Sequence, residues 1–266
     1  RFTSVLDSGS SQWLGITFNG GAGVLEHTIV RYTGRGCYGC PGTTSAGIAA
    51  LNVQSGLVTI QASRVITSTG SSNHDHGVYV SNSRVAISDT TFSGIGNDPA
   101  QKDYPIYITG ASSDVSLSGN VFHDNIYNRV ALQGPSAMTA HSFTLAAQAV
   151  LDGYVLLTDD YGAVMTIPSG ITMTVEPSVT LMAPANGALL VQGRLQAIGT
   201  EAQPILFTST EDSGAYQWLG ITFNGGTSKF GNVPRGSTTT TGNGAYQIDQ
   251  NNASPNSTYV YATNDG

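Results

Sequence analysis

Gln12-Trp13-Leu14-Gly15-Ile16-Thr17-Phe18-Asn19-Gly20-Gly21 recurs without a single change as Gln217–Gly226. Over the longer stretches Arg1–Gly21 and Leu206–Gly226, 16 of 21 positions are identical at a constant spacing of 205 residues. Self-similarity of this length is typical of repeat architectures, in which one structural unit stacks on the next. Because the first copy stands at the start of the sequence, we expect the chain to open in the middle of a module.

The composition favours a polar extracellular scaffold. Only 10% of the 266 residues are charged, 33 are glycine, and the net charge is −7; soluble proteins have roughly 25% charged residues. A net negative chain cannot neutralise a run of phosphates, which argues against nucleic acid as a partner. No window of about 18 unbroken apolar residues exists, so no membrane span is predicted. We expect a secreted or cell-surface protein.

Short apolar triplets recur along the first half of the chain. One series is Val58-Thr59-Ile60, Val85-Ala86-Ile87 and Val115-Ser116-Leu117, and a second begins at Leu51, Val78, Ile106 and Val130. Each triplet alternates apolar and small or polar residues, which is the period of a half-buried strand. Two strand positions that advance together by about 27 residues predict the turns of a solenoid. Only residues 140–151 have a pattern that predicts a short helix, and the alternation of Phe143 and Leu145 within them fits a strand equally well.

The second half carries a family resemblance. Residues 164–181 alternate almost strictly around Ile167-Pro168-Ser169-Gly170-Ile171, followed by 189–200 and by Phe207-Thr208-Ser209 ahead of Gln217–Phe223. This order resembles the first coils of modules in bacterial right-handed parallel β-helix repeat proteins. The resemblance covers about 160–226 well and 1–135 more loosely. It implies an all-β, right-handed parallel β-helix, a single-stranded solenoid of roughly ten coils.

We therefore predict three segments. Residues 1–135 form the later coils of one module, 136–226 form the first coils of a second module in the same solenoid, and 227–266 form a tail or capping segment rich in Gly, Ser, Thr and Asn. Asn252 and Asn256 lie in N-glycosylation sequons, which matter only if the source glycosylates. Cys37 and Cys40 stand in a Gly-rich stretch without a legible helix, so a local disulfide is favoured over redox chemistry or zinc binding.

Candidate chemistry is sparse. His74, Asp75 and His76 offer a weak metal or acid–base site, against the alternative of a solvated turn. Stacked coils would bring side chains about 27 residues apart close together, so weak catalytic candidates are the carboxylates and cations Asp98, Lys102, Asp103, Asp124 and Arg129. No position reproduces a lyase or hydrolase motif. No cofactor is expected, although structural calcium is compatible with the sequence.

Tyr79 and Tyr107 occupy equivalent middle positions of consecutive triplets. Both rings should therefore point outward, stacked on one face, where aromatic rings can contact sugars or simply support the neighbouring strand. They are weak candidates for carbohydrate contact.

The leading prediction is a structural or adhesive β-solenoid module that stacks end to end with other modules or with identical subunits, giving a filament if chains polymerise. The alternative is a carbohydrate-active enzyme, a polysaccharide lyase or glycoside hydrolase, or a carbohydrate-binding β-helix, with its cleft along the Tyr79/Tyr107 face. The fold itself does not decide between them, because one fold hosts many functions.

Overall fold

The computed structural model describes most of the chain as short strands. The described residues are 1–3, 5–7, 9, 13–33, 48–68, 75–96, 102–134, 137–157, 165–185, 187–213, 217–223, 227–231 and 258–260. Two compact units are present: unit 1 comprises Arg1–Ala131 and Gln148–Asp152, and unit 2 comprises Leu132–Ala147 and Gly153–Gly266. The predicted module boundaries stay a prediction, since a compact unit need not coincide with a sequence repeat.

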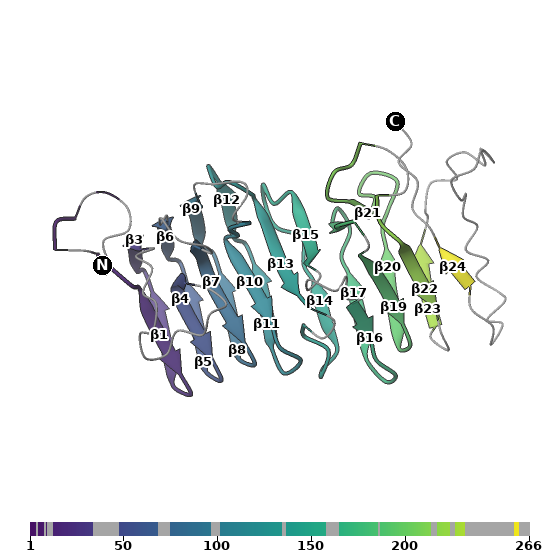
Figure 1. The fold of residues 1–266 in the computed structure, drawn as a ribbon, viewed down its shortest axis with the longest axis horizontal. Helices are drawn as coiled ribbons and strands as arrows, with labels where there is room; N and C mark the ends of the chain where they lie inside the picture. Colours follow the sequence, from purple (N-terminus) through teal and green to yellow (C-terminus); the bar gives the residue numbers. More distant parts are fainter. Residues whose placement is uncertain are drawn as a thin grey trace. The chain divides into compact units, whose positions relative to one another are not determined.

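Unit 1 is built from three parallel sheets (Figure 1). The first contains, in spatial order, β1 (Ile16–Asn19), β4 (Ile48–Gln54), β7 (Asp75–Ser81), β10 (Ile106–Thr109) and β13 (Arg129–Gln133), the last of which crosses the division. The second contains β2 (Ala22–Glu26), β5 (Leu57–Gln61), β8 (Arg84–Ser88) and β11 (Asp114–Ser118). The third contains β3 (Ile29–Thr33), β6 (Arg64–Ser68), β9 (Thr91–Ile95) and β12 (Val121–His123).

Unit 2 follows the same plan. One sheet contains β15 (Gly153–Leu157), β18 (Thr180–Ala183) and β21 (Leu206–Ser209). A second contains β16 (Met165–Ile167), β19 (Ala188–Val191), β22 (Gly220–Phe223) and β24 (Thr258–Val260), and a third contains β14 (Phe143–Leu145), β17 (Thr172–Val175), β20 (Arg194–Ile198) and β23 (Thr227–Gly231). All pairings are parallel except β22 with β24.

This arrangement confirms the predicted fold class, an all-β, right-handed parallel β-helix. The predicted triplets lie in register: Val58 faces Val85, which faces Val115, and Val78 faces Ile106. The segment 140–151 forms strand β14 at Phe143–Leu145, and no helix occurs in the described ranges. In particular, the described residues contain no helix long and apolar enough to cross a membrane.

The core consists of stacked inward side chains. Phe92 and Phe122, on neighbouring coils, stack with ring centroids 5.2 Å apart and an interplanar angle of 7°. Leu51, Val78 and Ile106 form another column of fully buried residues. Because every coil removes its apolar side chains from water only against the coils above and below, stability comes from contacts between neighbours.

The corners of unit 1 differ in length. Between the first and second sheets the connections are two residues in three coils (20–21, 55–56 and 82–83), and between the second and third sheets they are two residues in all four. The return to the first sheet varies instead: 14 residues between β3 and β4, six between β6 and β7, ten between β9 and β10, and five between β12 and β13. The fourth connection between the first and second sheets, from β10 to β11, has four residues, so most of the length variation lies at the return corner, which precedes the strands that carry the predicted site residues.

One two-residue corner carries a ladder of polar side chains. In each coil, a residue in the left-handed region (His27, Ala62, Asp89 or Gly119) precedes a hydroxyl or amide residue. Ser63 Oγ accepts the Thr28 N–H at 3.0 Å, Thr90 Oγ1 accepts the Ser63 N–H at 3.4 Å, and Asn120 Oδ1 accepts the Thr90 N–H at 3.0 Å. Each side chain thereby satisfies a backbone donor of the preceding coil that a sharp corner would otherwise leave without a partner.

Asn120 tests this ladder. Its side chain is fully buried, and its amide Nδ2 also donates to the Ile87 carbonyl at 2.9 Å. Asn120→Leu removes the partner of at least two buried backbone groups, so we expect a loss of about 2–4 kcal/mol in the free energy of unfolding, measured by urea denaturation. Ser116→Ala, on the exposed face of β11, is the matched control and should change the unfolding free energy by under about 0.5 kcal/mol. Equal losses for the two variants would contradict a structural role for the ladder.

Candidate functional site

The structure gathers several predicted site residues into one buried cluster of unit 1. Asp75 and Asp103 lie three residues before the paired positions Val78 and Ile106, so they occupy equivalent places on consecutive coils. Each is 1% exposed, and the neighbouring His76 is fully buried. The sequence analysis does not pair Asp75 with Asp103. Extending the spacing of the triplets at Val78 and Ile106 by three residues toward the N-terminus would have predicted this pair.

The polar atoms of this cluster join the two coils. Asp103 Oδ1 accepts the backbone N–H of Asp75 at 2.7 Å, and His76 Nδ1 accepts the backbone N–H of Tyr104 at 3.1 Å. Because an accepting Nδ1 carries no proton, the neutral imidazole holds its proton on Nε2. The carboxylate and the imidazole therefore act here as reciprocal clamps: one reaches from the later coil to the earlier, and the other reaches back.

Aromatic rings surround the clamps. The His76 and Tyr107 ring centroids are 4.3 Å apart, those of Tyr79 and Tyr107 are 5.5 Å apart, and both pairs are stacked. Tyr104 stacks on Tyr127 at 5.6 Å, and the Arg129 guanidinium lies 5.3 Å from the centre of the Tyr127 ring. The cluster thus extends over three successive coils, at the starts of β7, β10 and β13.

The expected stacking of Tyr79 on Tyr107 is present, but the expected exposure is not. The Tyr79 side chain is only 5% exposed, and that of Tyr107 is half-buried. Alternation along a strand correctly places both rings on the face away from Val78 and Val80, yet it says nothing about what covers that face. A ring buried to this degree does not offer an open platform for a sugar.

The remaining candidates do not join the cluster as an open reactive set. Lys102 is exposed, and the Asp124 side chain is 85% exposed and pairs with His123, with Asp124 Oδ2 2.8 Å from His123 Nδ1. Cys37, Cys40, His74 and Asp98 lie outside the described residues, as do Asn252 and Asn256. Within the described ranges, no group of three or more His, Cys, Asp and Glu side chains is placed to hold a metal ion.

Burial also shifts the ionisation of the tyrosines. Burial, followed by the neighbouring Tyr127, raises the pKa of Tyr104 above the usual value of about 10, and burial with Tyr79 nearby does the same for the pKa of Tyr107. In unit 2, burial raises the pKa of Tyr154, whose hydroxyl donates to the Ala146 carbonyl at 2.7 Å. None of these phenols is a base near neutral pH.

This has a testable consequence at high pH. A raised pKa in the folded state means that the unfolded chain loses protons first, so the contribution of these tyrosines to stability is complete below pH 10 and falls as pH rises above it. In a titration of tyrosinate absorbance, one fraction should ionise only together with unfolding, and Tyr104→Phe with Tyr107→Phe should reduce that late fraction. Ionisation of every tyrosine near pH 10, before any loss of circular dichroism, would contradict the burial.

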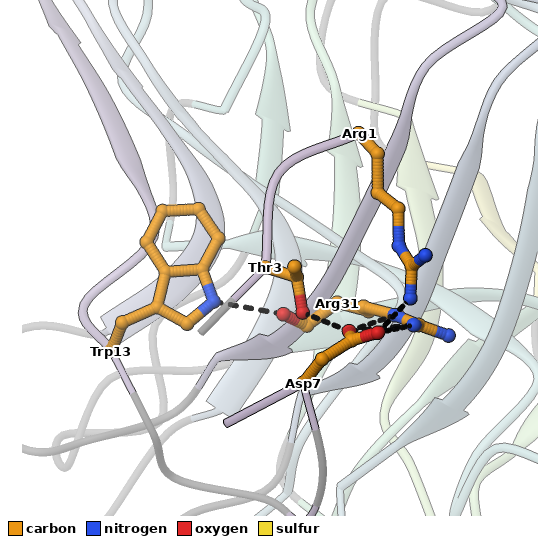
Figure 2. Close-up of polar contacts among 5 residues, drawn as sticks. All are labelled: Arg1, Thr3, Asp7, Trp13 and Arg31. Atoms are coloured by element: carbon orange, nitrogen blue, oxygen red, sulfur yellow. Dashed lines mark hydrogen bonds and ion pairs between the residues drawn. The ribbon is translucent and has the colours of Figure 1, made fainter. Parts of the chain in front are cut away.

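A second polar cluster belongs to the repeated segment. Figure 2 shows Arg1, Thr3 and Arg31 converging on the carboxylate of Asp7. Arg31 Nε donates to Asp7 Oδ1 at 2.9 Å, and the Trp13 indole N–H donates to the Arg31 carbonyl at 2.8 Å. These contacts link Asp7 and Trp13 to Arg31 of β3.

The second copy rebuilds part of this geometry. Thr208 donates to Asp212 as Thr3 does to Asp7, and the two aspartates share a left-handed φ of 44° and 48°. Gly15 and Gly220 have φ of 90° and 89°. A side chain at Gly15 would lie 2.5 Å from the Ala50 carbonyl, so this position requires glycine for the turn and for the close approach of β4. The repeated sequence therefore encodes one local structure twice.

Comparison with known proteins supports the architecture. Residues 46–149 match the family described as right handed beta helix region. No curated protein and no solved structure matches the chain.

Proposed function

We propose that this chain is a structural segment of a secreted or cell-surface β-solenoid, of the kind found in bacteria, whose modules stack end to end with other modules or with identical subunits. The observation that carries the proposal is the repeated segment. It builds the same glycine turn in both copies and leads each copy into a strand with one edge hydrogen-bonded to a parallel neighbour, β4 for β1 and β19 for β22. Such an edge is an adhesive surface for any further coil in the same register.

The polar cluster of unit 1 supports a scaffolding role over a catalytic one. Asp75 and Asp103 are 1% exposed, so a dissolved substrate does not reach their carboxylates. The Asp103 carboxylate and the His76 imidazole each accept a hydrogen bond from a backbone N–H of the adjacent coil. Side chains that close such contacts stabilise the stack, because a buried donor without a partner costs about 1–3 kcal/mol.

The surface composition fits this role. With 10% charged residues and 33 glycines, the chain presents mainly hydroxyl and amide groups. Its net charge of −7 makes chains repel each other. At physiological salt this repulsion is largely screened at separations beyond about 8 Å. Contacts between coils at the ends can therefore form in saline media outside the cell.

End-to-end stacking predicts concentration-dependent assemblies. We expect light scattering and negative-stain electron microscopy of the 266-residue chain to show unbranched chains of particles that lengthen as protein concentration rises. Salt should favour them, because it screens the repulsion between negative chains. Single particles of uniform size at every concentration and ionic strength would overturn the proposal.

One observation favours a second candidate, carbohydrate binding or cleavage. The His76–Tyr107–Tyr79 stack adjoins two carboxylates on consecutive coils, and paired carboxylates with stacking rings are what glycoside cleavage and sugar contact require. This candidate demands that the segments around the cluster open to admit a sugar.

Asp103→Asn separates the two functions. Asn keeps an oxygen that can accept the Asp75 N–H, so the fold should persist, but it has no ionisable carboxyl. We expect neither the wild-type chain nor this variant to release reducing ends or unsaturated products from a broad panel of polysaccharides. Products formed by the wild type and lost in Asp103→Asn, with unchanged thermal unfolding, would establish the enzymatic function instead.

A further inference from the structure

The two copies of the repeated segment pair with different neighbours. Copy 1 is Arg1–Gly21 and copy 2 is Leu206–Gly226. The strand of copy 1, β1, pairs with β4 of the following coil, with Ile16 opposite Leu51. The strand of copy 2, β22, pairs with β19 of the preceding coil, with Ile221 opposite Leu189. The structure thus records how one sequence binds a coil on each of its two edges.

Three apolar side chains of copy 1 are more exposed than their counterparts in copy 2. Phe2 is 45% exposed whereas its counterpart Phe207 is half-buried. Ile16 and Phe18 are half-buried, whereas Ile221 and Phe223 are 3% and 8% exposed. In copy 2, β18 and β19 cover the preceding edge, and β24 pairs with the other edge of β22. The β18–β20 coil covers these side chains in copy 2, so it also fits the identical side chains of copy 1.

We propose that chains join by exchange: copy 1 of one chain takes the place of copy 2 on the β18–β20 coil of another chain. The inference rests on the proposed end-to-end assembly and names its partner, a second copy of this chain, and its joint. Thr17 of the incoming chain would lie opposite Leu190, as Thr222 does now. Ala22–Glu26 would follow in the place of β23, opposite Arg194–Ile198.

Such a joint needs no new complementarity. Its preceding edge reproduces the pairing of copy 2 with β18 and β19, and its following edge keeps the pairing of copy 1 with β4. The inward residue Leu25 would meet Ala197, the buried residue that now faces position 230. The solenoid would continue through the joint with its strands parallel and in register.

Three of the five positions that differ between the copies are described in both, and these three do not obstruct the exchange. Val5 and Leu6 replace Thr210 and Glu211, and both side chains of copy 1 are exposed. Arg1 replaces Leu206, and both are exposed as well. The sixteen identical positions include every residue of β22 and the residues that lead into it.

The exchange also has a driving force. Before the exchange, copy 1 pairs with β4 on its following edge and copy 2 pairs with β18 and β19 on its preceding edge. After the exchange, copy 1 pairs with coils on both of its edges. The displaced copy 2 regains the conformational entropy that its ordering had cost, while the same contacts are made by a segment that is already folded. The antiparallel pairing of β22 with β24 is given up, which sets a barrier and makes joining slow.

Disulfide trapping identifies the joint. Chains carrying Thr17→Cys are mixed with chains carrying Leu190→Cys under mild oxidation, and dimers are mapped by mass spectrometry. Paired residues on adjacent strands lie within the 4.4–6.8 Å between Cα atoms that a disulfide needs. The matched control is Thr166→Cys, in the same column one coil further away. We expect at least ten-fold more cross-linked dimer with Leu190→Cys than with this control.

Two further arms decide the outcome. Thr17→Cys with Thr222→Cys should cross-link only if copy 1 docks on the outer edge of copy 2, and a dominant yield there overturns exchange while leaving end-to-end stacking intact. Val24→Cys with Gln196→Cys repeats the test on another strand, should Leu190→Cys lower the thermal stability. Assemblies without either predicted cross-link refute the exchange, and the absence of any assembly refutes the proposed function with it.

Discussion

Every feature of this molecule depends on one constraint: each coil must offer the next a strand edge in the same register. Parallel ladders satisfy backbone N–H and C=O groups only between neighbours about 4.8 Å apart. A one-residue slip would turn the apolar residues outward. The two-residue corners and the Ser63–Thr90–Asn120 ladder hold that register, because side-chain oxygens bind the N–H groups that the bends leave over. The clamps of His76 and Asp103 serve the same purpose at the corner of variable length.

The sequence predicts the stacked strands well because periodicity is a local property. Spacing alone predicts the pairing of Val58, Val85 and Val115, and the structure confirms it. The buried environment of Tyr79 was beyond such reasoning, because alternation gives the direction of a side chain and not what covers it. Asp75 and Asp103 illustrate a third case. Their proximity follows from the register, yet their role as clamps depends on which backbone donors the corner leaves available.

The repeated segment shows how one sequence serves two positions. Its glycine turn and its Thr–Asp contact recur unchanged, while the burial of its apolar residues follows the neighbour at hand. The sequence of the segment therefore determines its local structure, and contacts with adjacent coils stabilise it, as expected when repeats contact only their neighbours. In the proposed role, function resides in the strand edges through which modules join, whereas an enzyme of the same fold needs an open cluster of reactive groups.

The unequal corners have a practical consequence. In unit 1, the corner between the second and third sheets always has two residues and the corner between the first and second sheets has two to four. The return corner has connections of five to 14 residues. Loop closure grows only slowly more costly with length, so foreign peptides inserted at this corner should be displayed at successive heights along the stack, spaced by the strand separation. A scaffold that accepts insertions at one corner can therefore hold short peptides at separations that are multiples of about 4.8 Å.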